Sequence, residues 1–295
     1  MKILLATDGS KYSEDAARFL VKLKLSPDDE INILYAVSWV PVLSEWEILY
    51  ADFKAIQEEF APRIFNSTLD ALKPAKAKLS TVLKEDYPDK AIVDTAEESG
   101  TDLVVMGARG LRGVGSLIVG SVTKLVALKS HKPVLIVRLP EVSKSGSMKI
   151  LFATDGSAYS DAVGKILASI PFPDNTELTI LNVIPTVFRD IPERFAVEIN
   201  NRIKNIVADT REKELKESEK IIDKAYKDLS GKFSKIEKMI KFGDASTLIL
   251  DEAEAAHADI IAVGTSGMRG LKGMLGSVAR YVLNHSKSSV LIAKM

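Results

Sequence analysis

Two stretches of small and polar residues follow apolar runs, and both have the composition of a phosphate-binding loop. Residues 6–10 read Ala-Thr-Asp-Gly-Ser, and residues 107–110 read Gly-Ala-Arg-Gly, followed by nine residues and then Gly120-Ser121. Glycine lets a ligand approach the backbone closely. A helix that begins at Ser121 would present free N–H groups and a positive dipole end to an anion, and Thr123 would add a hydroxyl donor.

The first stretch has a second reading that the residues alone leave open. Asp8-Gly9-Ser10 also has the composition of a tight turn and a helix cap, in which small polar side chains satisfy the unpaired N–H groups of a helix. The same stretch recurs almost unchanged at residues 153–157, where Asp155 takes the place of Asp8. A cap alone would tolerate Asn or Thr at this position, so the recurrence favours a role in binding.

Three other motifs for phosphate or acyl chemistry are missing from the sequence. There is no G-x-x-x-x-G-K-[ST] loop and therefore no lysine of that kind to stabilise a transferring phosphate. There is no G-x-G-x-x-G after the first strand and no G-x-S-x-G nucleophile elbow. The pattern therefore favours binding of a phosphate over its transfer.

The amino-acid composition excludes several classes of functional site and of protein. The 295 residues contain no cysteine, which excludes disulfides, thiolate nucleophiles and Cys-ligated metals. Forty basic and forty acidic residues give zero net charge, so no general positive field attracts nucleic acid. No apolar run approaches the roughly 18 residues of a membrane span, and the first apolar run is too short for a signal peptide. We expect a cytoplasmic protein that has no membrane span and does not bind nucleic acid.

The chain is a tandem repeat. Residues 2–13 and 149–160 agree at ten of twelve positions, at an offset of 147 residues. Two copies of this size indicate duplicated domains. The segment 139–147, which is rich in Ser and contains Pro and Gly, reads as a flexible connection. We predict one domain at residues 1–139, a linker at 140–147 and a second domain at 148–295, called copy one and copy two below.

Within each copy, apolar runs alternate with helical patterns. In copy one we expect strands at 3–6, 31–37, 103–106 and 134–137, and helices at about 10–24, 89–98 and 121–130. A long helical stretch at 43–83 should be broken at Pro62 and Pro74. The third strand is weakly marked, at 236–242 in copy two and 81–85 in copy one. The alternation predicts an α/β fold made of two doubly wound, parallel five-stranded sheets.

Other features have ordinary explanations. His131, His257 and His285 are scattered without the spacing of metal ligands, so we place them on surface helices or loops. Residues 211–227 alternate in charge and predict a solvated helix face. The aromatic residues of the first insert should pack a helix on the core, with an exposed partner-binding patch as the alternative; they are Trp39, Trp46, Tyr50, Phe53 and Phe60.

Taken together, these motifs make the chain resemble a tandem universal stress protein over nearly its whole length. The ATP-binding branch of that family carries G-x2-G-x9-G-[ST] after its fourth strand, and copy one matches this motif in full. The resemblance implies a Rossmann-like fold of the adenine nucleotide alpha hydrolase type. It also implies that the last strands of the two copies, at 134–137 and 290–293, meet as an intramolecular pseudo-dimer, and two such chains could associate further.

The same resemblance implies a ligand and its contacts. An adenine nucleotide, ATP or else AMP or ADP, would sit at the carboxyl ends of the strands, with Mg²⁺ beside a triphosphate although no carboxylate cage is visible. Asp8, next to Ala6 and Thr7, would contact adenine, as would the backbone of Val37. The sugar and phosphates would be held by Met106, Gly107, Gly110, Gly120, Ser121, Val122 and Thr123, and Arg109 could meet a phosphate.

Copy two departs from the family pattern. Its glycine loop is one residue shorter, and Ala279 replaces Thr123. Whether copy two binds nucleotide is therefore left open. Its candidate residues are Ala153, Thr154, Asp155, Val183, Val263, Gly264, Gly267, Gly276, Ser277 and Val278.

The function that the resemblance implies is that of a nucleotide-binding protein in stress response or signalling, and not an enzyme, because no general base or P-loop lysine can be assigned. Two alternatives remain. One is a slow ATPase, which would turn over ATP in an Asp8-dependent way. The other is a scaffold that binds no nucleotide, which would show no response to ATP.

Overall fold

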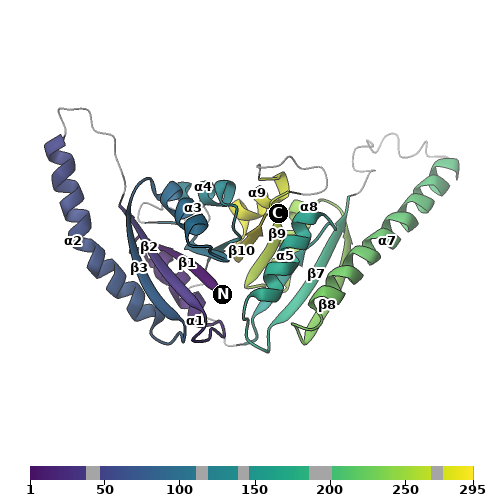
Figure 1. Cartoon of the computed structure of the whole chain (residues 1–295). Coiled ribbons are helices and arrows are strands. Elements are labelled where there is room, and N and C mark those ends of the chain that lie inside the picture. The colour runs from purple at the N-terminus through teal and green to yellow at the C-terminus, as the bar shows by residue number, and fades with distance from the viewer. Residues whose placement is uncertain (38–46, 111–118, 139–145, 186–200, 267–274, 295) are drawn as a thin grey trace.

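The computed structural model describes residues 1–37, 47–110, 119–138, 146–185, 201–266 and 275–294, with the backbone alone at 47–58 and 201–207. Each copy alternates strands and helices (Figure 1). Copy one contains β1 (Lys2–Thr7), α1 (Lys11–Val21), β2 (Glu30–Val37), α2 (Glu47–Leu72), β3 (Lys78–Glu85), α3 (Pro88–Glu98), β4 (Leu103–Gly107), α4 (Ser121–Lys129) and β5 (Val134–Val137). Copy two contains β6 (Lys149–Ala153), α5 (Ala158–Ser169), β7 (Glu177–Ile184), α7 (Asn201–Leu229), β8 (Lys235–Phe242), α8 (Ala245–Ala255), β9 (Ile260–Gly264), α9 (Ser277–His285) and β10 (Ser289–Ala293).

All of these strands belong to one ten-stranded sheet, in the order β3-β2-β1-β4-β5-β10-β9-β6-β7-β8. Pairing is parallel within each copy. The copies are joined by antiparallel pairing of β5 with β10, where Leu135 lies opposite Leu291. The predicted contact between the last strands is thereby confirmed, and the fold is the doubly wound α/β class that the sequence predicts.

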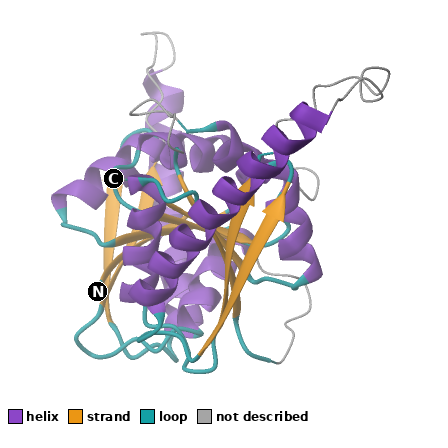
Figure 2. Ribbon diagram, turned by 90° about the vertical axis from the view of Figure 1, so that its right-hand side faces the viewer, coloured by secondary structure: helices purple, strands orange, loops and turns teal. Residues whose placement is uncertain are grey.

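Helices cover both faces of this sheet (Figure 2). On one face, α1, α2, α5 and α7 pack over inward residues such as Ile3, Leu5 and Ile33. On the other face, α3, α4, α8 and α9 pack over the alternate residues, such as Leu4 and Val104. Burial on both sides explains why β4 and β5 are continuous apolar runs.

Each copy also places a basic side chain against the end of a helix in the other copy. Arg138, which follows β5, donates from Nη2 to Leu283 O near the end of α9, at 3.0 Å. Lys294, which follows β10, donates to Leu128 O near the end of α4. Each cation therefore lies at the negative end of a helix dipole in the other copy. Burial lowers the pKa of Lys294.

The structure corrects two expectations for the first insert. The predicted helical stretch ran to residue 83, but α2 ends at Leu72 and β3 occupies Lys78–Glu85. Pro62 does not break α2, which continues through it, whereas Pro74 lies beyond its end. A proline inside a helix costs about 3 kcal/mol. Packing of Phe65, Leu69 and Leu72 on the core outweighs that cost.

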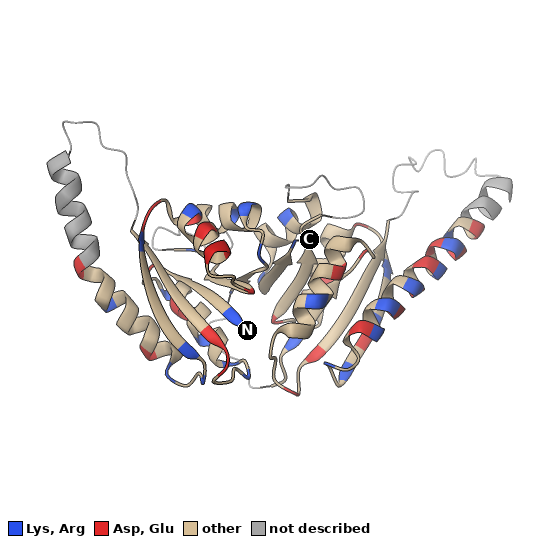
Figure 3. Cartoon of the chain, viewed as in Figure 1, with Lys and Arg blue, Asp and Glu red and all other residues tan. Residues whose placement is uncertain are grey.

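The described side chains test the predictions for the aromatic residues of the first insert, for the charged part of α7 and for the histidines. Phe60 is 46% exposed, so for this residue the core-packing expectation was wrong. Trp39 and Trp46 lie outside the described residues, and the side chains of Tyr50 and Phe53 are not described. The charge-dense part of α7 is a solvated face with mixed charges, as predicted (Figure 3). His131, His257 and His285 are exposed, as expected.

Candidate nucleotide-binding site

The Asp loop of copy one is a tight turn between β1 and α1. Asp8 Oδ1 accepts a hydrogen bond from Ser10 N at 3.0 Å, and Ser10 Oγ accepts from Ser13 N at 3.3 Å to cap α1. Gly9 has a φ of +75°, a conformation that favours glycine. The turn-and-cap interpretation is therefore correct for Oδ1 of Asp8 and for Ser10. It does not account for the position of the second carboxylate oxygen, Oδ2.

Oδ2 of Asp8 lies against the glycine loop. A Cβ placed on Gly110 would lie only 2.2 Å from this oxygen. A Cβ on Gly107 would lie 2.6 Å from the backbone carbonyl of Tyr12. Both positions therefore require glycine because another part of the chain approaches them, and the two predicted loops meet at the carboxyl ends of β1 and β4. In open α/β sheets this edge is where ligands bind.

The amino end of α4 completes this edge. Gly120 precedes the helix and provides no side-chain cap, and its own N–H donates to Ala108 O at 2.9 Å. The first N–H groups of α4, at Ser121, Val122 and Thr123, therefore have no side-chain cap among the described residues. Such groups suit an anion.

Thr123 has a different local role from the one the resemblance implies. Its side chain is 2% exposed, and Oγ1 donates to Gly107 O at 3.1 Å. The hydroxyl hydrogen is thus used to join the two ends of the glycine loop. The Thr123 oxygen can then only accept hydrogen bonds, so it cannot donate one to a phosphate.

Arg109 is buried in the glycine loop, at 7% exposure. Its Nη1 donates to the Tyr12 hydroxyl at 3.2 Å, and its guanidinium carbon lies 5.4 Å from the centre of the Tyr12 ring. Arg109 also acts on Arg138. Burial lowers the pKa of Arg138 to about 10, and the positive charge of Arg109 contributes to this shift. The site therefore has a fixed positive charge beneath its glycine loop.

The strand ends that would face a base are closely packed. Ala6 pairs with Met106 in the sheet, and both are buried. Val37 O accepts a hydrogen bond from Asp86 N at 3.2 Å, so one acceptor at the end of β2 is already used. Tyr35 lies beside Thr7 in the sheet, and its pKa is raised by burial and by the charge of Asp8.

Copy two repeats the Asp loop. Asp155 Oδ1 accepts from Ser157 N at 3.0 Å, and Gly156 has a φ of +75°. Its surroundings differ, because Asn182 Nδ2 donates to Thr154 O at 2.7 Å and Asn182 Oδ1 accepts from Ser218 Oγ at 2.6 Å. Ala153 precedes this loop at the end of β6.

The glycine loop of copy two is described only at its two ends. Val263 and Gly264 close β9, and Gly276 N donates to Thr265 O at 2.6 Å before Ser277 and Val278 begin α9. Gly267 lies outside the described residues. The positions equivalent to Arg109 and Thr123 hold Ser266 and Ala279, so copy two lacks both the guanidinium and the hydroxyl.

The predicted counterpart of Val37 in copy two, Val183, is one position away from the residue that makes the same contact. The carbonyl of Ile184 accepts from Gly243 N at 3.0 Å, which is the contact that Val37 O makes with Asp86 N in copy one. The equivalent of Val37 is therefore Ile184, and the assignment of Val183 was wrong. A shift of one residue in a strand reverses the face on which a side chain lies.

Several residues at this edge were missed by sequence reasoning. Thr7 Oγ1 lies 3.1 Å from Thr68 Oγ1 of α2, and Tyr12, Tyr35, Asn182 and Ser218 make the contacts described above. Only the tyrosine after the Asp loop left a signal, because it recurs as Tyr159 in copy two. The remaining contacts join segments far apart in the chain.

No group of His, Asp and Glu side chains suited to a metal ion is found in the part of the chain that the structure describes. Among the same residues, no helix is both long and apolar enough to cross a membrane.

Comparison with known proteins agrees with the fold and the repeat. The family model described as the universal stress protein family matches residues 1–138 and again residues 146–294. The chain belongs to the universal stress protein family. A family member from Methanocaldococcus jannaschii, universal stress protein MJ0531, is 31% identical over 152 residues, which cover 48% of this chain and 83% of that protein. The match therefore spans about one copy.

A solved universal stress protein from Archaeoglobus fulgidus resembles both copies at once. It covers 99% of this chain, and 96% of its own length is matched, at a TM-score of 0.63 and 20% identity. At that identity the likeness concerns the fold, including its tandem layout. A family protein from Arabidopsis thaliana, solved with AMP bound, matches 48% of this chain and 93% of its own at a TM-score of 0.34 and 14% identity.

Proposed function

We propose that copy one binds an adenine nucleotide, with ATP as the preferred ligand, at the edge formed by the Asp loop, the glycine loop and the amino end of α4. The proposal rests mainly on one observation, the approach of Asp8 Oδ2 to Gly110, which brings the two loops together. A carboxylate there can accept hydrogen bonds from a sugar or a base, while the glycine backbone beyond it leaves room for phosphates.

The charged groups at this edge are complementary to a nucleotide. The acidic Asp8 follows β1, whereas the buried guanidinium of Arg109 belongs to the loop after β4, and the open amino end of α4 follows that loop. A neutral base and sugar would face the carboxylate, and the phosphates would face the positive groups. Any Mg²⁺ would arrive with a triphosphate.

We expect binding without efficient turnover. Efficient hydrolysis of ATP needs a group that orients the attacking water and a cation that follows the developing charge on the phosphate. Arg109 is a poor candidate for the cation, because Tyr12 already holds its side chain. The protein would then act as a nucleotide-dependent signalling component whose two states differ in ligand occupancy.

Copy two is proposed to bind nucleotide more weakly or not at all. It lacks the counterparts of Arg109 and Thr123. In addition, the amide of Asn182, which accepts a hydrogen bond from Ser218, donates one to the carbonyl of Thr154 next to Asp155. The chain would thus carry one loaded copy and one copy that serves as its structural partner.

Calorimetric titration of nucleotide-stripped protein with Mg-ATP tests both statements. We expect a stoichiometry near one, and negligible phosphate release over the same period. A stoichiometry near two would contradict the assignment of copy two. Absence of heat, with no thermal shift on adding ATP, ADP, AMP or cyclic AMP, would contradict nucleotide binding, and steady phosphate release lost in Asp8→Ala would favour a slow ATPase.

A further inference from the structure

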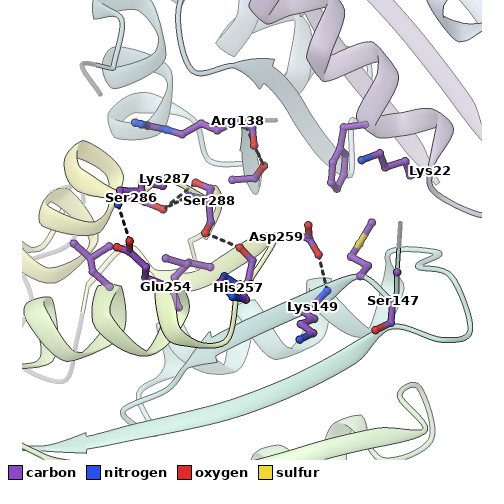
Figure 4. Close-up of a pocket in the computed structure, with 18 of the residues that line it drawn as sticks. Lys22, Arg138, Ser147, Lys149, Glu254, His257, Asp259, Ser286, Lys287 and Ser288 are labelled. Carbon is purple, nitrogen blue, oxygen red and sulfur yellow. Dashed lines mark hydrogen bonds and ion pairs between the residues drawn. The ribbon is translucent and has the colours of Figure 1, made fainter. Parts of the chain in front are cut away.

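A second cavity lies between the two copies, away from the loops described above. Its volume is about 740 Å³, and its wall combines residues of α1 and the end of β5 with residues 146–149 and residues of α8, α9 and the segments that follow them. We call it the seam cavity. Figure 4 shows Arg138 and Lys22 of copy one on one side and Glu254, His257 and Lys287 of copy two on the other.

The seam cavity is distinct from the proposed nucleotide site. It is formed where β6, β9 and β10 begin, as its wall residues Lys149, Asp259 and Ser289 show, whereas the Asp and glycine loops follow the ends of their strands. Gly146, Ser147 and Met148 belong to the segment that enters copy two. This part of the wall exists because both copies are on one chain. Its volume falls in the range of about 300–1,000 Å³ that is usual for small-molecule sites.

The wall carries an excess of positive charge. Its four basic side chains are Lys22, Arg138, Lys149 and Lys287, and its two acidic side chains are Glu254 and Asp259, which gives a net charge of +2 with histidines neutral. Both acids are already engaged, because Glu254 pairs with Lys287 Nζ at 2.7 Å and Asp259 accepts from Lys149 N at 2.8 Å.

Lys22 and Arg138 belong to the copy-one part of this wall, and the Arg138 guanidinium is held by Leu283 O. Lys22 is the C-cap of α1 and has no ion-pair partner among the described residues. Arg138 lies close enough to the buried Arg109 for the two charges to repel, and it is partly desolvated. An anion in the cavity would reduce that repulsion.

His257 adds a second unusual feature to the wall. It has a φ of +52°, in the left-handed region that favours glycine, and its counterpart in copy one is Gly100 with a φ of +61°. Copy two therefore holds a larger residue under backbone strain where copy one has glycine. The imidazole is placed beside the cavity, where it can donate a hydrogen bond.

Apolar side chains form another part of the wall, beside polar residues such as Ser147, Asn175 and Ser286. Phe19 comes from α1, Leu250 and Ala253 from α8, and Met148 and Ile261 from the start of copy two and from β9. Such a surface suits a hydrocarbon or an aromatic ring, and the basic side chains suit a carboxylate, sulfonate or phosphate group.

We propose that the seam cavity is a ligand site for a small amphipathic organic anion, with its apolar body against Phe19, Met148 and Leu250 and its charged group toward Lys22. The site needs both copies, since each supplies part of the apolar wall and part of the charge.

A fluorescence titration of the full chain with 8-anilinonaphthalene-1-sulfonate tests this assignment, because the probe has an apolar ring system and a single negative charge. Gly146→Trp is the principal variant. Gly146 lines the cavity, and a Cβ there would meet nothing within 4 Å, so the position accepts a bulky side chain beside the cavity. Gly231→Trp is its matched control, because Gly231 has equally open surroundings and lies outside the cavity wall.

We expect Gly146→Trp to weaken probe binding about tenfold, which corresponds to about 1.4 kcal/mol, and Gly231→Trp to leave it unchanged. Lys22→Gln combined with Lys287→Gln should weaken binding severalfold, whereas Lys213→Gln, on the exposed face of α7, should not. Octanoate should compete with the probe. Saturating Mg-ATP should not displace it.

Two results would overturn the proposal. Equal probe affinity in Gly146→Trp and Gly231→Trp would show that the probe does not occupy the seam cavity. Displacement by Mg-ATP, with Gly146→Trp unaffected, would place the probe in the nucleotide site. Either result leaves the calorimetric test of ATP binding independent.

Discussion

The two Asp loops have nearly the same sequence and the same backbone, yet they lie in different surroundings. In copy one, the loop faces the Tyr12–Arg109 pair, and Thr7 contacts Thr68 of α2. In copy two, Ser266 takes the place of Arg109, and a buried amide and hydroxyl at Asn182 and Ser218 lie beside Thr154. A duplicated motif therefore does not by itself duplicate a site, because the residues that set its charge come from elsewhere in the fold.

The largest expected effect concerns close packing at the end of the fourth strand of each copy. Gly107→Ala would place a Cβ 2.6 Å from the Tyr12 backbone, whereas Gly264→Ala would place one 3.0 Å from Tyr159. We expect Gly107→Ala to lower the free energy of unfolding by about 3 kcal/mol and Gly264→Ala by about 1 kcal/mol. Urea unfolding of both variants measures the difference, and equal losses would show that the two copies are packed alike.

The next effect separates the structural from the binding role of the Asp loop. Asp8→Ala and Asp155→Ala remove the same hydrogen bond to a helix-capping serine, at 3.0 Å in each copy, and each should cost about 1 kcal/mol of stability. Only Asp8→Ala should also weaken Mg-ATP binding, by about tenfold or about 1.4 kcal/mol. Calorimetric titration of both variants checks this. A similar loss of affinity in Asp155→Ala would mean that copy two binds as well.

A smaller effect is expected from exchanging the charged residue that distinguishes the glycine loops. Arg109→Ser gives copy one the residue of copy two, and we expect it to weaken ATP binding severalfold and AMP binding less, because ATP carries more charge for Arg109 to attract. The ratio of ATP to AMP affinity in one titration series measures this. An equal loss for both nucleotides would argue that Arg109 only packs against Tyr12, and Ser266→Arg serves as the reverse exchange.

The smallest effect concerns Tyr35, whose position in copy two is taken by Asn182. Burial and the charge of Asp8 raise the pKa of Tyr35, so the folded chain holds this proton more tightly than the unfolded chain. The resulting stabilisation is present below the ordinary tyrosine pKa and is lost as the pH rises through the raised value. Tyr35→Phe should therefore lose less stability than the parent chain between about pH 8 and about pH 11.

Urea midpoints of the two proteins at both pH values give this difference, which should be below about 1 kcal/mol. Other tyrosines and lysines titrate in both proteins and cancel in the comparison. An identical pH dependence would indicate that folding does not raise the pKa of Tyr35.

The sequence by itself determined the fold class, the repeat and the two loops. Apolar runs fix buried strands, because a strand covered on both faces has no polar side to show, and helical spacing fixes the helices that cover them. Residues 6–10 and 107–110 were likewise visible, because the demands of a turn and of a close backbone approach are local. The third strand of copy one was weakly marked because it lies at the sheet edge and alternates in burial.

Only the tertiary structure decided how these parts meet. It carried α2 through Pro62 and placed Oδ2 of Asp8 against Gly110. It also joined the two copies in one sheet and formed the seam cavity between them. Each of these depends on contacts between residues distant in the chain, where packing outweighs local preference, and such contacts have no signature in the spacing of neighbouring residues.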